Sequence, residues 1–425
     1  MSTDSLTPDT AVSPLAQLWL RLRRGDSGMV PILIGTVLLA GYFEVRSSAF
    51  LTVGNLNNLF IQAAVFVLLG MAEIWLLLLG EIDLSLGFVA ALSGATGVIL
   101  TDTQFHWPWY SAVAVAMLLS MALGSLTGLA VIRLRLPSFI VSLALQIILL
   151  GFLLDVTDSQ GVGGTISITN TFLHDLVYGQ LSKIWTVVAI VATVAAIVGQ
   201  SFWRNVSRKK RGLETAPTVL LGMRAFFVVV CGGVAVWLFD ANRGHFIAIE
   251  GMPWAIVIVG GVLALSTFIL NRTKAGRYIY AIGGNQEAAR RAGIRVDAYR
   301  LLAFALAGLT AGIAGLLYVS NLNGVNNAVP GGTLVLYAVA SAVIGGTSLF
   351  GGRGKMVHAL IGGTIIAMIY NGMALLSTTA YMQYIATGLV LLAAVTVDKS
   401  AGRGSGSNRS MLRRLLGRRT SSSES

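Results

Sequence analysis

The chain has 425 residues, of which 55% are hydrophobic and 11% are charged, and its formal net charge is +12. An ordinary soluble domain carries about 25% charged residues. The composition therefore excludes a soluble globular protein and indicates an all-α, polytopic helical membrane protein. The single cysteine, Cys231, excludes an intramolecular disulfide.

The chain opens with a polar segment, residues 1–27, whose end is basic ("RLRR"). The apolar run that follows resembles the apolar part of a signal peptide. No small-residue cleavage site comes after it, however, and many more apolar segments do. We predict a cytoplasmic N-terminal segment followed by a transmembrane domain, 28–398, whose first helix is retained.

Twelve transmembrane helices are predicted, because a helix needs about 20 apolar residues to cross the bilayer. The third and tenth segments contain Gly, Ser and Thr and could be broken or re-entrant. The predicted spans are about 28–45, 59–79, 84–101, 109–131, 137–154, 184–202, 222–239, 253–270, 301–319, 333–350, 356–377 and 381–398.

The basic residues predict the orientation of these spans. If the loops alternate from a cytoplasmic N-terminus, 27 of the 30 Lys and Arg residues fall inside, and the other three are Arg46, Lys183 and Arg243. Short loops rich in Lys and Arg stay cytoplasmic, so both termini are predicted to be cytoplasmic. A re-entrant tenth span would put the basic tail, 399–425, outside, so we prefer a crossing.

The tail is predicted to be disordered and could lie on anionic lipid, whereas nucleic-acid binding is not expected.

Two carboxylates, Glu81 and Asp83, interrupt apolar sequence in "GEIDLSLG" (80–87). They could be loop charges at the cytoplasmic membrane surface. Alternatively they could lie in a helix break buried in protein, with Ser85 or Asp83 capping the next helix and the acids holding the break or lining a gate. Glu73, inside the second span, is assigned no role.

The loop 271–300 is the one long inside loop that does not read as a flexible linker. Its "QEAARRAGI" predicts a short amphipathic helix with Glu287 near its positive N-terminal end, Arg290 and Arg291 after it, and Gly293 at its stop. Such a helix suits docking into a groove of a partner. The alternative is an ordinary solvated connection.

No catalytic site, metal site or cofactor is predicted. "GGRGKM" (351–356) has the wrong spacing for a phosphate-binding loop, and the four histidines are scattered without cysteine partners. The chain is therefore expected not to be an enzyme, and any ATP must be bound by another subunit.

The loop closely resembles the "GGN-x-EAAR-x-x-GI" signature of permease subunits of the ribose/xylose class of ABC sugar importers. The stretches "NLNNL" (55–59), "EIDLSLG" (81–87), "GGTSLFGG" (345–352) and "NG" (371–372) match the same family in order. The resemblance covers nearly everything from 28 to 398.

The resemblance implies a permease homodimer in the bacterial plasma (inner) membrane, with a cytoplasmic ABC ATPase below and an extracytoplasmic sugar-binding protein outside. It also implies the sites. The ATPase-coupling residues are Gly283, Gly284, Asn285, Glu287, Ala288, Ala289, Arg290 and Gly293, and the candidates for the translocation path or gate are Glu81, Asp83, Ser85, Gly345, Gly346, Thr347, Ser348 and Asn371.

The substrate prediction rests on an inserted helical hairpin, about 184–239. Ribose-like members of the family look like ten-span proteins without this hairpin, whereas the xylose-type permeases are longer in this region and resemble this chain. D-xylose is therefore the best prediction for the substrate, and another pentose or hexose is the alternative. The tenth span departs from the family, with Val335-Leu336-Tyr337 in place of a Glu-Leu-Asp run. The outside loop 156–183 is a plausible landing site for the binding protein, or a connector.

Three further expectations remain open. The spans after 300 could mirror those before 160 as an inverted repeat, which would place a substrate path at the repeat interface. A proton-coupled secondary transporter using Glu73 or Asp83 is an alternative function, and a silent membrane scaffold is a third.

Overall fold

The computed structural model describes residues 29–102, 105–161, 164–213, 218–242, 250–326 and 331–379, together with 381–383, 385–389, 392 and 396. These residues are mostly helical, which confirms the predicted all-α class. The predicted segments 1–27 and 399–425, and part of the predicted span 381–398, lie outside the described residues.

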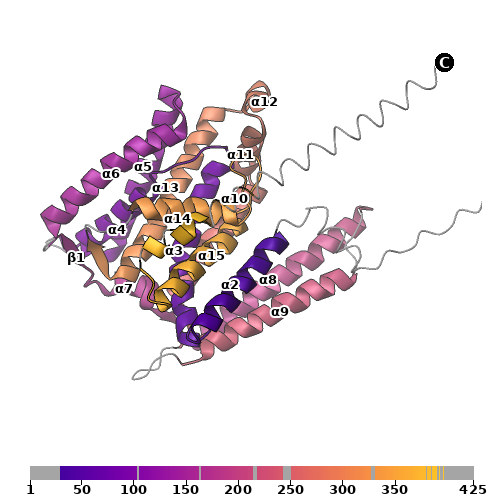
Figure 1. The fold of residues 1–425 in the computed structure, drawn as a ribbon. Helices are drawn as coiled ribbons and strands as arrows, with labels where there is room; N and C mark the ends of the chain where they lie inside the picture. The colour runs from indigo at the N-terminus through magenta and orange to yellow at the C-terminus, as the bar shows by residue number, and fades with distance from the viewer. Residues whose placement is uncertain are drawn as a thin grey trace, which may run out of the picture.

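Fourteen helices account for most of the described chain (Figure 1). They are α2 (Met29–Arg46), α3 (Val53–Leu77), α4 (Leu86–Asp102), α5 (Trp109–Leu134), α6 (Ser138–Gln160), α7 (Thr171–Tyr178), α8 (Lys183–Lys210), α9 (Thr218–Asp240), α10 (Trp254–Arg272), α11 (Lys274–Gly284), α12 (Gln286–Arg291), α13 (Val296–Leu322), α14 (Gly331–Ile344) and α15 (Met356–Leu375).

Four short strands join segments that are distant in the sequence. β1 (Thr165–Ser167) pairs antiparallel with β4 (Gly324–Asn326), and β2 (Gln180–Leu181) pairs antiparallel with β3 (Met252–Pro253). Both pairs lie at helix ends, so they fix connections and add no sheet layer.

Eight of the described helices are long and apolar enough to cross a membrane: α3, α5, α6, α8, α9, α10, α13 and α15. Two shorter apolar helices, α4 and α14, occupy the third and tenth predicted spans. A helix of 14 residues, such as α14, is about 21 Å long, less than the roughly 30 Å of the hydrocarbon core. The Gly-, Ser- and Thr-containing segments are therefore the ones with shortened helices, and α2 covers the first predicted span.

The core consists of two groups of three helices, α3–α5 and α13–α15, and the first helix of each group packs on the second and third helices of the other group. α3 packs on α14 and α15, and α13 packs correspondingly on α4 and α5, while α4 packs on α5 as α14 packs on α15. Small residues allow the close approach, since a Cβ at Gly124 would overlap the backbone of α13 and one at Gly363 would overlap the backbone of α3. This correspondence fits the inverted repeat expected for the spans on either side of the middle of the chain.

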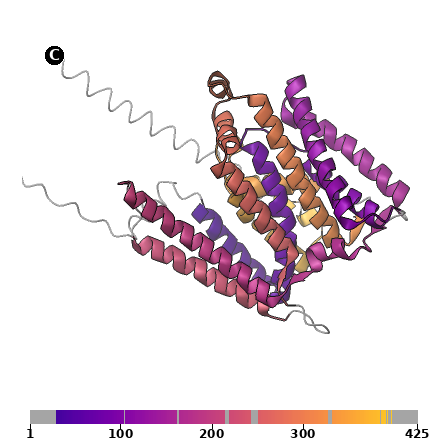
Figure 2. The same cartoon turned by 180° about the vertical axis from the view of Figure 1, so that it is seen from behind.

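α8 and α9 form an antiparallel pair at the side of the bundle. Figures 1 and 2 both show the pair on the opposite side of the molecule from α5 and α6. Leu238, Phe239 and Met252 attach the pair to the start of α3 at one end. Most of its remaining surface is exposed.

Candidate functional site

The loop between α10 and α13 folds into two helices. Asn285 ends α11 and begins α12, and its side-chain oxygen accepts a hydrogen bond from the backbone N–H of Ala288 at 2.9 Å. Gly293 follows α12 with a φ of +81°, a conformation that favours glycine. The predicted short helix is thus confirmed. α11 was not predicted, although its buried Ile279 and Ile282 have helical spacing.

α12 has a buried face and a charged face. Ala289 is buried and clusters with Ile282 and Val296 against the end of α3 and the start of α13. The opposite face exposes Glu287 and Arg290, whose side chains are 61% and 57% exposed. Arg291 pairs with Glu287 at 3.1 Å. One turn of helix therefore packs on the bundle while its charges remain open to a partner.

Three of the motifs singled out in the sequence meet at a junction of glycines. The N–H of Gly352 donates to the carbonyl of Leu78, at the end of α3, at 2.9 Å. A Cβ at Gly283 would overlap the same carbonyl, and a Cβ at Gly351 would crowd the carbonyl of Gly283 and the N–H of Gly80. We name these residues (Leu78, Gly80, Gly283, Gly351 and Gly352) the glycine junction. It joins α11, the end of α3 and the turn before α15 through backbone contacts alone.

Tyr280 adds a side-chain contact beside the glycine junction. Its hydroxyl donates to the carbonyl of Gly354 at 2.7 Å, and burial raises the pKa of the phenol above its ordinary value. The phenol therefore stays neutral and keeps its proton for this hydrogen bond.

Glu81 is not a free surface charge. Its carboxylate pairs with the guanidinium of Arg300, in the first turns of α13, at 2.5 Å. The two side chains are only 16% and 15% exposed. The pair ties the segment that follows α3 to the helix that follows the loop 271–300.

Asp83 is fully buried and holds the turn that begins α4. Its Oδ1 accepts from the backbone N–H of Ser85 at 2.8 Å and from the Ser85 hydroxyl at 2.5 Å. The carbonyl of Ser85 in turn accepts the first N–H groups of α4, from Phe88 and Val89. Asp83 is therefore not a surface loop charge, because protein buries it fully, whereas Glu81 keeps a small exposed fraction and is paired with Arg300.

The segment between α3 and α4 runs along the first turns of α6. The N–H of Ile82 donates to the hydroxyl of Ser138 at 3.1 Å, and the N–H of Leu84 donates to that of Ser142 at 2.9 Å. The two serines are one helical turn apart, so the segment advances by about 5–6 Å along α6. Their hydroxyls satisfy backbone groups that no helix or sheet satisfies here.

Glu73 approaches the same segment from α3. Its Oε1 lies 3.4 Å from the backbone nitrogen of Asp83, which donates to it. Among the described residues, Oε2 of Glu73 and Oδ2 of Asp83 are buried with no hydrogen-bond partner. Two acceptor atoms are thus left open beside the start of α4.

The N-terminal ends of α4 and α14 meet inside the bundle. A Cβ at Gly87 would overlap the carbonyl of Gly331, and a Cβ at Gly331 would overlap the ring of Phe88. The first N–H groups of a helix have no partner within the helix, and its N-terminal end carries partial positive charge. Two short apolar helices therefore begin close together, which brings the partial positive charges of both N-terminal ends to one place.

The other path candidates lie in two separate places. Gly345, Gly346, Thr347 and Ser348 form the turn after α14, where Gly346 has a φ of +104° and Thr347 Oγ1 lies 3.1 Å from Nδ1 of His358. Asn371 accepts a hydrogen bond from the side chain of Asn55 at 2.8 Å, which joins the "NLNNL" and "NG" motifs.

Several residues of the site carried no readable signal in the sequence. Ser138 and Ser142 are ordinary helix serines by pattern. Arg300 contributes to the sequence prediction only as one of the basic residues that orient the spans, and Glu73 is assigned no role there. Ser138, Ser142 and Arg300 acquire their places from contacts with residues far away along the chain, and Glu73 acquires its place from the turn ten residues after it.

Comparison with known proteins places these features in a family. Residues 55–395 match the family model described as "Branched-chain amino acid transport system / permease component". The xylose transport system permease protein XylH of Escherichia coli K12 is 34% identical over 378 residues, which cover 89% of this chain and 92% of the relative. XylH of Haemophilus influenzae is 32% identical over 87% of this chain and 95% of the relative. The ribose import permease protein RbsC of Escherichia coli K12 is 30% identical over 86% and 92%, respectively. No solved structure matches the chain.

Proposed function

The chain belongs to this family of transport permeases, and on that premise we propose that it is the membrane subunit of an ABC importer that moves a monosaccharide inward. It is a multi-pass protein of the bacterial inner membrane. The observation that carries the proposal is α12, a six-residue helix with an exposed charged face, whose Ala289 packs on Ile282 of α11, the helix that contributes Gly283 to the glycine junction. A transporter without an ATPase partner has no use for such a helix.

The ATPase is proposed to dock on the exposed face of α12. Movement of α12 then reaches the end of α3 and the turn before α15 through the glycine junction, and reaches the segment before α4 through the Arg300–Glu81 pair. These are packed backbone and ionic contacts, the kind that transmit a displacement between two arrangements. ATP hydrolysis belongs to the partner, and this chain performs no catalysis.

The sugar is proposed to pass the meeting point of α4 and α14. Helix N–H groups there can donate to hydroxyl oxygens, and the open oxygen of Asp83 can accept from a hydroxyl. A neutral polyhydroxylated substrate needs donors and acceptors together and no counter-ion. Alternating access would then expose this point first to the outside and then to the cytoplasm.

D-xylose is the proposed substrate, since two relatives named as xylose permeases are 34% and 32% identical to the chain over most of its length. A ribose-type substrate is the alternative, because a relative named as a ribose permease is 30% identical. An extracytoplasmic sugar-binding protein is proposed to deliver the sugar, as the resemblance to the ribose/xylose class of ABC importers implies.

Twelve spans and cytoplasmic termini are proposed as well, supported by the distribution of basic residues. A homodimer is proposed from the resemblance to the ribose/xylose class of permeases. The domain limits are proposed as 1–27, 28–398 and 399–425, with the hairpin 184–239 as an insert and 271–300 as the docking loop. Reaction of single cysteines in the two terminal segments with a membrane-impermeant reagent, in sealed vesicles of known orientation, tests the placement of the termini.

Uptake by proteoliposomes tests the function. Vesicles that hold the permease, its ATPase, ATP and the binding protein should accumulate labelled D-xylose in preference to D-ribose. Vesicles without the ATPase should accumulate neither sugar. Uptake driven by a proton gradient alone would instead support a secondary transporter and would refute the proposal.

A further inference from the structure

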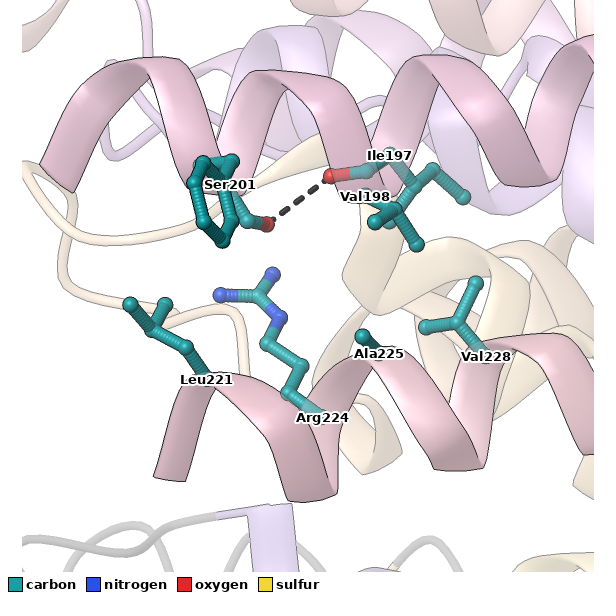
Figure 3. A pocket seen from close by; sticks show the side chains of 8 residues that line it. Ile197, Val198, Ser201, Leu221, Arg224, Ala225 and Val228 are labelled. Carbon is teal, nitrogen blue, oxygen red and sulfur yellow. Dashed lines mark hydrogen bonds between the residues drawn. The ribbon is translucent and has the colours of Figure 1, made fainter. Parts of the chain in front are cut away.

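The α8–α9 pair carries a shallow cleft near the end where α8 finishes and α9 begins (Figure 3). Its walls are mostly apolar, with one charged side chain, and include Ser201, Phe202, Leu221, Arg224, Ala225 and Val228. The pair stands at the side of the bundle and is almost entirely exposed, so the cleft lies on helices that the rest of the described chain leaves uncovered.

Arg224 lies within α9 and not in the loop before it. It is six residues after Thr218, the first residue of α9, and therefore about 9 Å along the helix. Figure 3 shows its side chain extending from α9 toward α8. The nearby hydroxyl of Ser201 donates to the carbonyl of Ile197 at 2.8 Å. A guanidinium at this depth is costly unless it finds a partner or reaches the membrane surface.

The described part of the chain offers Arg224 no anionic partner. Within residues 183–213 and 218–242 the one acidic side chain is Asp240, which pairs with Lys183 at the opposite end of the two helices. Five further basic residues lie at the C-terminal end of α8, beyond the part of the helix that lines the cleft, and none of them forms an ion pair with a described residue. They are Arg204, Arg208, Lys209, Lys210 and Arg211.

We propose that this cleft binds the headgroup of an anionic phospholipid, with the lipid phosphate on Arg224 and the acyl chains along the apolar walls. A guanidinium binds phosphate through two parallel hydrogen bonds. Phe202, Leu221 and Val228 supply the apolar contact that a free anion cannot use. Basic pockets between transmembrane helices on the cytoplasmic side suit such headgroups. A purely topological role for the positive charges does not require an arginine within an apolar cleft.

The test is lipid binding to the intact purified chain, followed by native mass spectrometry during titration with phosphatidylglycerol or phosphatidylcholine. Wild-type protein is expected to retain phosphatidylglycerol preferentially. Arg224→Ala should weaken that retention about fivefold, in line with the effect of one basic residue near a membrane surface. Ala225→Phe, which fills the cleft without a change of charge, should weaken it as well.

The matched control is Arg133→Ala, which removes another exposed arginine, in the last turn of α5. It should leave the retention of phosphatidylglycerol unchanged, and size-exclusion profiles should show that all variants remain folded. The proposal is overturned if Arg224→Ala binds phosphatidylglycerol like wild type, or if Arg133→Ala loses as much. It is also overturned if inorganic phosphate displaces the lipid at equal concentration, because the site would then recognise a soluble anion.

Discussion

The ion pair between Glu81 and Arg300 gives a prediction whose size follows from its burial. Exposed ion pairs contribute roughly 0.2–1 kcal/mol, whereas removing one partner of a buried pair costs about 3–5 kcal/mol. The side chains of this pair are 16% and 15% exposed, so the pair lies nearer the buried limit. We expect Arg300→Ala to lower the free energy of unfolding by about 2–4 kcal/mol, because it leaves the carboxylate without its cation.

The double variant separates the pair from its parts. Glu81→Gln should destabilise the protein as well, but Glu81→Gln with Arg300→Ala should cost less than the sum of the two single changes, since no lone charge remains. Unfolding in mixed micelles, followed while a denaturing detergent is titrated, gives the three free energies. Arg295→Ala is the control, because this nearby arginine is exposed and forms no ion pair with a described residue.

The same variants report on transmission. If the pair links the segment before α4 to the docking loop, Arg300→Ala should lower sugar uptake per ATP hydrolysed more strongly than Arg295→Ala does. Strictly additive single and double variants, with unchanged uptake per ATP, would refute the reasoning.

Three more predictions concern the same region. Gly283→Ala should abolish uptake, because the added methyl group would overlap the backbone carbonyl at the end of α3. Gly284→Ala should keep most uptake, because a methyl group there meets no atom within 4 Å. Equal loss of uptake in the two variants would contradict the role given to the glycine junction. Glu287→Ala and Arg290→Ala should lower transport-coupled ATP hydrolysis while the protein stays folded, as judged by size exclusion, and undiminished coupling would remove the docking assignment. A cysteine at Asp83 should react with a cytoplasmic thiol reagent only during turnover, and rapid labelling in the resting state would contradict its burial.

The sequence predicted best those features whose causes are local. α12 has its capping residue, Asn285, and its terminating residue, Gly293, within eight positions of each other, so the pattern alone located it. The Gly, Ser and Thr content of the third and tenth segments likewise identified the two spans that could be broken or re-entrant, and both contain short helices.

Local patterns failed where a distant contact decides the structure. α3 begins at Val53, after the cap at Thr52, whereas hydropathy indicated a start at 59 because Asn55, Asn57 and Asn58 hide the first turns. One of these amides is satisfied by Asn371, 316 positions away. No periodicity reveals such a partner, and the same holds for Arg300 and Glu81, which are 219 positions apart.

The glycine junction has a consequence for how such permeases diversify. Its contacts are made by backbone atoms, so they are independent of side-chain identity once glycine is present. The charged face of α12, by contrast, consists of side chains that touch little of the bundle. The choice of ATPase therefore depends on side chains of α12, whereas the transmission of its movement to the membrane domain depends on backbone atoms of the glycine junction. Exchange of residues 286–291 between related permeases should transfer the choice of ATPase and leave the transmission of movement intact.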